Sequence, residues 1–348
     1  MIISSLIMFP NSCCFPDPCL ANFWWKLRVE SCALRGRGLA HGTWANKVSH
    51  LKSYIDFTTY FGVQDFPIKL EVLLRFIALL SRGSYAAKSA SNILGSLKYF
   101  ANVLCPSETE VFNSIMVASA MKGLKAQLSR PVHQKLPISV AHLVKFHNAL
   151  DFSNVGHLAC WCAMLLAFFG CLRLSNLVPS SPNQFDPLKH LKRDDIRFHK
   201  NFVLLFFKWA KTNQHAGRVS WIPICPVADA RFNVKVFLNQ LFEKVKVPSD
   251  SPLFSVSAEK FHTRSSLVKL LEMCTLKADL PTADYSWHSF RRGAAVFAFE
   301  LGLADSAVQL LGDWSSAAFK NYLEFSFLRK VSIAETISNN FDVSVKHS

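Results

Sequence analysis

Hydrophobic positions between His41 and about Lys125 recur with the period of an α-helix. Prolines and glycines interrupt this pattern at intervals, which is where helices are expected to end. The pattern predicts four amphipathic helices, at 43–57, 70–80, 86–104 and 111–128. Four such helices within about 90 residues are typical of a small helical bundle.

The pattern changes in the second half of the chain. Helices are predicted at 139–151 and 157–169, followed by two short runs rich in β-forming residues at 202–209 and 219–224. The stretch between these runs is polar and contains glycine, so the pair predicts a β-hairpin with a long loop. Beyond Pro226 the predicted helices are 227–245, 258–277, 286–301, 303–311, 315–326 and a last one near 328–339.

Residues 129–137 carry two prolines and no apolar period, so they are predicted to form a linker. Residues 1–38 have no clear periodicity and are treated as an appendage. The expected domains are thus 39–128 and 138–340. The expected fold class is mainly α, with an all-helical N-terminal domain and a mostly helical second domain that holds a small β-sheet.

The composition also indicates a class of binding partner. Half of the residues are hydrophobic, which is enough to bury a sizeable core, and the formal net charge is +15. Basic residues outnumber acidic ones in both predicted domains, so the excess is not a basic tail on a neutral protein. Both domains therefore look suited to contact a long polyanion such as nucleic acid.

The ten cysteines do not indicate a disulfide scaffold, because the chain is long and no C-x-x-C pair or zinc-type spacing occurs. The uncharged run Leu158–Leu172 is shorter than the roughly 20 residues that span a bilayer, so a buried core helix is predicted there. The N-terminus lacks the basic start of a signal peptide. We therefore expect an intracellular protein without a membrane segment.

Candidate chemistry lies at four separated places in the second domain. Arg173 follows the apolar run, and Lys211 stands in the predicted hairpin loop. His288 and Arg291 share a helix face, with Ser286 as a possible cap. Tyr322 follows Trp314 within a predicted helix. Taken singly, each is more simply interpreted as an ion-paired, solvated or half-buried residue.

The order of these residues changes the interpretation. Arg, then Lys on a hairpin, then H-x-x-R, then G-x-W followed by Tyr resembles the tyrosine recombinases of the phage-integrase family. The sequence most resembles the DIRS-type and crypton-type recombinases of eukaryotic mobile elements. The resemblance covers about residues 40–335. The resemblance implies a SAM-like core-binding domain before the catalytic domain, and an enzyme that cuts and rejoins double-stranded DNA without a cofactor or metal.

The resemblance also implies a role for each candidate. Arg173 and Arg291 would present forked donors to the phosphate oxygens, and His288 and Trp314 would be further phosphate-binding residues. Tyr322 would attack the phosphorus and leave a 3′-phosphotyrosine. Lys211 would protonate the leaving oxygen, although Lys208 competes for that role. The expected catalytic set is Arg173, Lys211, His288, Arg291, Trp314 and Tyr322.

Two features leave alternatives open. Asn176 stands where many relatives have a carboxylate, and Asp313-Trp314 replaces a histidine found in many bacterial relatives. One alternative is a DNA-binding protein that kept the fold and lost catalysis, and another is a monomeric nicking enzyme like the type IB topoisomerases. For the recombinase, the resemblance implies a nuclear protein with no small-molecule substrate. It would be monomeric when free and tetrameric on paired DNA sites.

Overall fold

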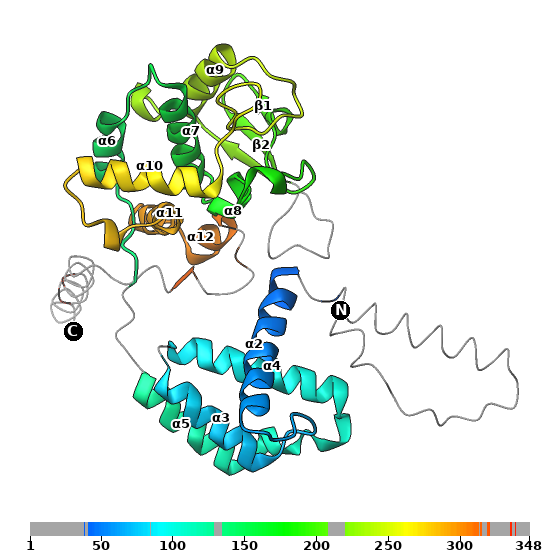
Figure 1. Cartoon of the computed structure of the whole chain (residues 1–348). Helices are drawn as coiled ribbons and strands as arrows, with labels where there is room; N and C mark the ends of the chain where they lie inside the picture. The colour runs from blue at the N-terminus through cyan, green and yellow to red at the C-terminus, as the bar shows by residue number, and fades with distance from the viewer. Residues whose placement is uncertain are drawn as a thin grey trace, which may run out of the picture. The chain divides into compact units, whose positions relative to one another are not determined.

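The protein is described by a computed structural model that covers residues 38, 41–83, 85–128, 134–207, 220–312, 314, 319–320, 335 and 338 (Figure 1). The chain divides into two compact units, Met1–Val132 and His133–Ser348. Most of the predicted appendage and the first half of the predicted linker lie outside the described residues. Lys135 and Leu136, from the second half of that linker, donate hydrogen bonds to the carbonyls of Ala283 and Asp284 in the second unit.

The first unit is all-helical across its described residues. Helix α3 packs on α5, and α2 packs on α4. The fourth helix begins later than the sequence pattern predicts, because two short 3-10 turns precede it. The elements are α2 (His41–Tyr60), α3 (Leu70–Arg82), α4 (Ala87–Leu104), η1 (Pro106–Glu108), η2 (Glu110–Asn113) and α5 (Ile115–Leu128).

An aromatic group forms the centre of the first core. The buried ring of Tyr54 lies edge-on to Phe76, with ring centres 5.2 Å apart, and also contacts Phe57 and Phe66. Its hydroxyl donates to the carbonyl of Asp65, so the polar end of this buried ring has a partner. The apolar positions that recur with the helix period in the sequence thus form the packed interior of the first unit.

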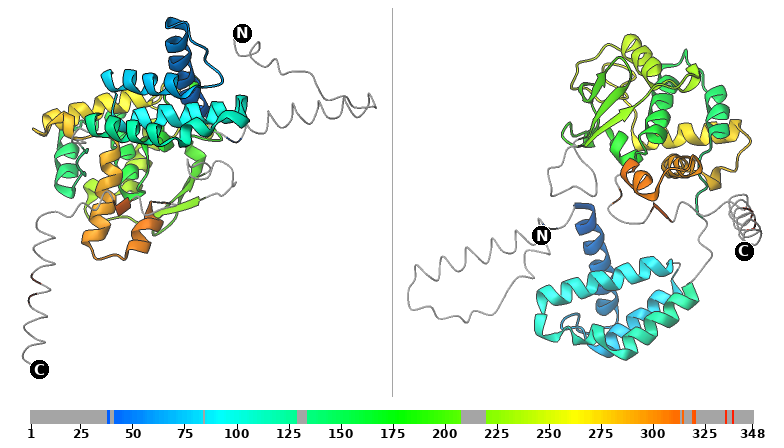
Figure 2. Two further views of the ribbon diagram at one scale, coloured as in Figure 1. Left: turned by 90° about the horizontal axis from the view of Figure 1, so that it is seen from below. Right: turned by 180° about the vertical axis from the view of Figure 1, so that it is seen from behind.

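The second unit surrounds helix α7, whose residues 158–168 are all buried. Figures 1 and 2 show α7 between α6 and the sheet. The described helices are α6 (Val140–Ala149), α7 (Val155–Phe169), α8 (Leu174–Leu177), α9 (Val234–Lys244), α10 (Arg264–Lys277), α11 (His288–Glu300) and α12 (Asp305–Leu311). The 3-10 turns are η3 (Pro182–Gln184), η4 (Arg193–Asp195), η5 (Ala230–Phe232) and η6 (Thr282–Asp284).

One antiparallel sheet with the order β1-β2-β3 is present in the described part of the second unit. Its strands are β1 (Ile196–Phe198), β2 (Val203–Phe207) and β3 (Ser220–Ile224). The predicted strand pair is present as β2 and β3, with Val203 opposite Ile224. Strand β1 is missing from the prediction because three residues are too short to display an alternating pattern. The loop that joins β2 and β3 lies outside the described residues.

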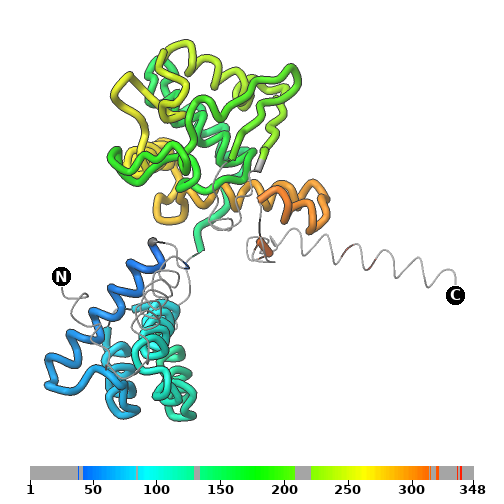
Figure 3. Tube along the Cα trace, turned by 90° about the vertical axis from the view of Figure 1, so that its right-hand side faces the viewer, coloured from blue at the N-terminus to red at the C-terminus, as the bar shows by residue number. Residues whose placement is uncertain are grey.

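Helices α11 and α12 follow one another closely and pack together as a helical hairpin, drawn in orange in Figure 3. The predicted cap at Ser286 is wrong: Trp287 occupies the N-cap position, and the Ser289 hydroxyl accepts from the Ser286 amide instead. The helices predicted at 315–326 and 328–339 lie almost entirely outside the described residues.

Helix α11 approaches the chain that leads into α6 unusually closely at Gly293. A β-carbon at this position would lie 2.0 Å from the carbonyl oxygen of Ile138. The Ile138 amide in turn donates to the Ser289 carbonyl at 2.9 Å, so the two backbones are held together. No side chain fits between them.

We expect Gly293→Ala to lower the free energy of unfolding of the second unit by about 1–3 kcal/mol, the usual cost of overpacking a well-packed interior. Chemical denaturation followed by circular dichroism measures this change. Gly95→Ala is the matched control, since Gly95 lies inside α4 and a β-carbon there has no neighbour within 4 Å. Alanine should stabilise that helix by up to about 1 kcal/mol. Equal effects at both positions would contradict the proposed close approach.

Candidate active site

The site is built around the turn that ends α7. Gly170 caps the helix, the Cys171 amide donates to the Phe168 carbonyl at 3.1 Å, and the Leu172 amide donates to the Ala167 carbonyl at 3.0 Å. This pair of bonds is the Schellman arrangement, which places one residue in the left-handed region. Here that residue is Cys171, with φ of 50°. The turn brings the chain sharply out of the buried helix.

Arg173 follows the turn and occupies the N-cap position of α8. Its amide donates to Oδ1 of the buried Asn176 at 3.3 Å, and the Asn176 amide donates to the Arg173 carbonyl at 2.9 Å. Asn176 therefore fixes the backbone at Arg173 through neutral hydrogen bonds. Asn176, which stands where a carboxylate was expected, therefore still orients the backbone at Arg173.

Arg291 is the centre of the site and is only 2% exposed. Its Nη1 donates to the carbonyl of Cys171, and its Nη2 donates to the carbonyl of Gly312 at 2.6 Å. The Trp314 ring covers the guanidinium, with 4.1 Å between the ring centre and Cζ. One side chain on α11 thereby connects the turn after α7 with the segment after α12.

Gly312 is required for this arrangement. A β-carbon at Gly312 would lie 1.9 Å from the Trp314 ring, so any other residue would push the ring away. Trp314 also contacts Phe319, and both belong to a small apolar cluster with Cys171 and residues of α11 and α12. This cluster is separate from the main core around α7 and packs directly against the site.

His288 begins α11, one turn before Arg291. The residue is exposed, but its ring has lost part of its surrounding water. This loss, together with the smaller effects of the charges of Arg291, Arg173 and Arg292 in that order, lowers the pKa of His288 to about 4. Three guanidiniums therefore surround this imidazole closely enough to disfavour its protonation.

The structure thus brings together Arg173, His288, Arg291 and Trp314 from three separate segments. Lys208, Lys211, Asp313 and Tyr322 lie outside the described residues. Arg292 is absent from the residues predicted from the sequence, although it is buried beside Arg291 and contributes positive charge at His288. The doubled arginine in the H-x-x-R-R run was the available signal.

Other features of the described residues do not compete for the role of active site. No group of three metal-ligating side chains is found within the described ranges, and no described helix is long and apolar enough to cross a membrane. The described cysteines, Cys105, Cys160, Cys162, Cys171, Cys225 and Cys274, are all unpaired thiols.

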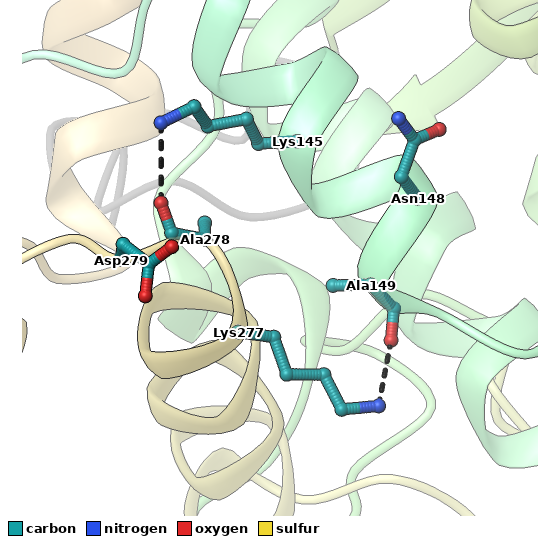
Figure 4. Close-up of a pocket in the computed structure, with 6 residues that line it drawn as sticks. All are labelled: Lys145, Asn148, Ala149, Lys277, Ala278 and Asp279. Carbon is teal, nitrogen blue, oxygen red and sulfur yellow. Dashed lines mark hydrogen bonds between the residues drawn. The ribbon is translucent and has the colours of Figure 1, made fainter.

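A cavity of about 440 Å³ lies between the C-terminal ends of α6 and α10 (Figure 4). Lys145 donates to the Ala278 carbonyl at 3.2 Å, and Lys277 donates to the Ala149 carbonyl at 3.1 Å. Each lysine thus neutralises the negative end of the other lysine's helix. The cavity holds none of the candidate catalytic residues, and its lysines serve the fold.

Comparison with known proteins supports the fold class. No family model and no curated protein sequence matches the chain. Among solved structures, a lambda integrase dimer bound to a COC′ core site superposes with a TM-score of 0.57 at 16% identity, covering 87% of this chain and 97% of that one.

Two further solved structures agree. The Tn1549 transposon integrase in complex with transposon right end DNA gives a TM-score of 0.59 at 15% identity, covering 89% of this chain and 98% of that one. The XerH recombinase bound to a palindromic difH substrate gives 0.58 at 16% identity, covering 84% and 78%. The chain has the fold of the tyrosine recombinases. The predicted fold class, mainly α with a small sheet, is confirmed.

The charge of His288 provides a test of the site. Its pKa is about 4 in the folded chain, against about 6.5 when unfolded, so the unfolded state binds more protons between these values. The stability of the second unit should therefore fall as pH drops through this window, by an amount that solvent reduces because His288 is exposed.

We expect the His288 ring to remain neutral at pH 6, as followed by nitrogen-detected NMR titration. In Arg291→Ala its pKa should rise, because Arg291 is the strongest charge acting on it. Arg231→Ala, which removes an exposed guanidinium paired with Asp229, is the matched control and should leave the titration unchanged. An ordinary His288 pKa in the native chain would contradict the described geometry.

Proposed function

We propose that this protein is a site-specific DNA recombinase that cuts and rejoins double-stranded DNA through a 3′-phosphotyrosine intermediate. The observation that carries the proposal is the convergence of Arg173, His288 and Arg291, with Trp314 on Arg291, at the ends of separate elements. The fold shared with recombinases supports it, because lambda integrase and the Tn1549 integrase are seen bound to DNA.

The chemistry of the cluster suits a phosphodiester. Cleavage without a metal must stabilise additional negative charge on the phosphorus, and preorganised guanidiniums supply that stabilisation. Arg173 stands at the start of α8, close enough to His288 for its charge to act on the imidazole, so we place its donors at the same phosphate. His288 is neutral near pH 7 and can donate one hydrogen bond without adding a fourth charge.

The reaction is completed by residues assigned from the sequence. The Tyr322 oxygen gives its proton to the neutral His288 ring as it attacks the phosphorus. It displaces the 5′ oxygen of the next nucleotide, which takes a proton from Lys211. The bond between phosphorus and tyrosine keeps the energy of the broken bond, so a second 5′-hydroxyl reverses the step without a cofactor. We assign the protein to a mobile element of the nucleus, with four copies acting on two paired DNA sites.

The deciding experiment uses a DNA duplex nicked just beyond the cleavage point and carrying the ends of the element. The short fragment released by cleavage diffuses away, so the covalent protein–DNA adduct accumulates and is visible on a denaturing gel. We expect such an adduct with the native chain. Binding of the same DNA with no adduct at any pH from 6 to 9 would favour a DNA-binding protein that has lost catalysis.

We further expect cleavage to survive an excess of EDTA. The cations that stabilise the transition state are Arg173, Arg291 and Lys211, and they need no metal. The measurement compares single-turnover cleavage rates with and without the chelator, and a magnesium-dependent nuclease on the same DNA is the positive control. Loss of cleavage that magnesium restores would indicate a different class of reaction.

A further inference from the structure

Cys171 occupies a backbone position that usually belongs to glycine. It stands directly after the cap of α7 with φ of 50°, where a β-carbon costs about 1 kcal/mol or more. The residue is completely buried in the small apolar cluster behind the site. Strain of this kind persists only where the surrounding structure holds it, and it is often found at functional sites.

Two contacts of Cys171 lead to Arg291. The Cys171 carbonyl accepts a hydrogen bond from Nη1 of Arg291, and the Cys171 thiol donates to the Arg291 carbonyl, with 3.6 Å between sulfur and oxygen. Both ends of Arg291 are thus held by one residue that lies 120 positions earlier in the chain. Two residues further on, the same turn delivers Arg173 to the start of α8.

A chemical role for the thiol does not fit these observations. Burial raises the pKa of Cys171 to about 11, although Arg291 and Arg173 act in the opposite direction. A protonated thiol without access to solvent is a poor nucleophile and a poor target for oxidation. The contribution of Cys171 therefore lies in its geometry.

We propose that Cys171 is a positioning residue, whose left-handed turn fixes Arg173 and the buried Arg291 relative to each other in the phosphate site. The proposal rests on the proposed function, because it assigns the turn to the phosphate grip of the recombinase. The carbonyl of Cys171 aims the Arg291 guanidinium, the thiol anchors the Arg291 backbone, and the left-handed conformation directs Arg173 toward the same point.

The test varies the backbone preference at position 171. Valine is branched at its β-carbon and strongly disfavours positive φ, whereas glycine adopts it freely. We expect Cys171→Val to lower the rate of single-turnover cleavage about 100-fold, the scale for a misplacement of about 1 Å. Cys171→Gly should recover at least about tenfold of that loss. DNA affinity should change less than about threefold in both, since most phosphate contacts lie elsewhere.

The matched control is Cys160→Val. Cys160 is equally buried, but it lies inside α7 and outside the apolar cluster that supports the site. The Cys160→Val variant should cleave DNA at nearly the native rate. If Cys160→Val loses as much as Cys171→Val, the loss comes from general disturbance of the core and the proposal is overturned. A glycine variant as slow as the valine variant would overturn it equally.

A double-mutant cycle isolates the route of the effect. If Cys171 acts through Arg291, adding Cys171→Val to Arg291→Ala should cost clearly less than the 100-fold it costs alone. Full additivity would overturn the proposal. If the valine variant fails to fold, Cys171→Ala replaces it: loss of the thiol donor alone should slow cleavage about threefold. An alanine variant at the native rate, with DNA affinity unchanged, would then overturn the role of the thiol.

The outcomes separate this inference from the proposed function. A native chain that binds the nicked DNA and forms no adduct contradicts the recombinase itself. A native chain that forms the adduct, together with a valine variant that forms it equally fast, leaves the recombinase in place and removes only the role of Cys171.

Discussion

Tyr322→Phe is expected to abolish the covalent protein–DNA adduct while DNA affinity stays nearly unchanged. The substitution removes one hydroxyl and keeps the ring, so packing and charge are preserved while the nucleophile is lost. The adduct on nicked DNA is measured on a denaturing gel, and affinity by a mobility-shift titration on the intact duplex.

Tyr285→Phe is the matched control for this prediction. Tyr285 lies in the same unit, and its hydroxyl contacts Nε2 of His142 at 3.5 Å. The control should form the adduct at nearly the native rate. An adduct that persists in Tyr322→Phe would overturn the assignment of Tyr322, and phosphopeptide mapping would then locate the true nucleophile.

Replacement of either arginine by alanine is expected to lower the cleavage rate by about 10²-fold or more, the usual loss for one preorganised donor. Arg173→Lys and Arg291→Lys should restore little, since an ammonium group cannot make a forked contact with two oxygens. Single-turnover cleavage of nicked DNA measures both effects. Full activity in the two lysine variants would contradict the forked grip.

The two positions should differ in stability. Arg291→Ala leaves the buried carbonyls of Cys171 and Gly312 without their donor, which costs about 1–3 kcal/mol for each group left unsatisfied. Arg173 makes no such side-chain contact among the described residues, so Arg173→Ala should unfold at nearly the native temperature. Arg231→Ala serves as the charge control, because its ion pair with Asp229 is exposed and contributes little to stability.

Much of the secondary structure could be predicted from the sequence, because helix periodicity is a local property. The apolar run Leu158–Leu172 is found in the core, mainly as α7, and the strand pair β2–β3 is present where the β-rich runs predict it. Short elements escaped prediction, since β1 has three residues and α8 has four, too few to display a period. The cap of α11 was misassigned because Ser289, not Ser286, offers its side chain to the free backbone group.

The sequence by itself determined the residue types of the site and the placement of His288 and Arg291 on one helix face. Their order along the chain, with Arg173, Lys211 and Tyr322, led to the predicted chemistry. Local spacing cannot determine which distant segments meet, because that depends on how helices pack.

Only the tertiary structure decided that Arg291 bonds to the carbonyls of Cys171 and Gly312 and lies under Trp314. It also decided that Gly293 admits the backbone of Ile138, which holds α11 against the chain entering α6. These contacts join positions up to 155 residues apart, and they form because burying the apolar faces of α7 and α11 brings their ends together.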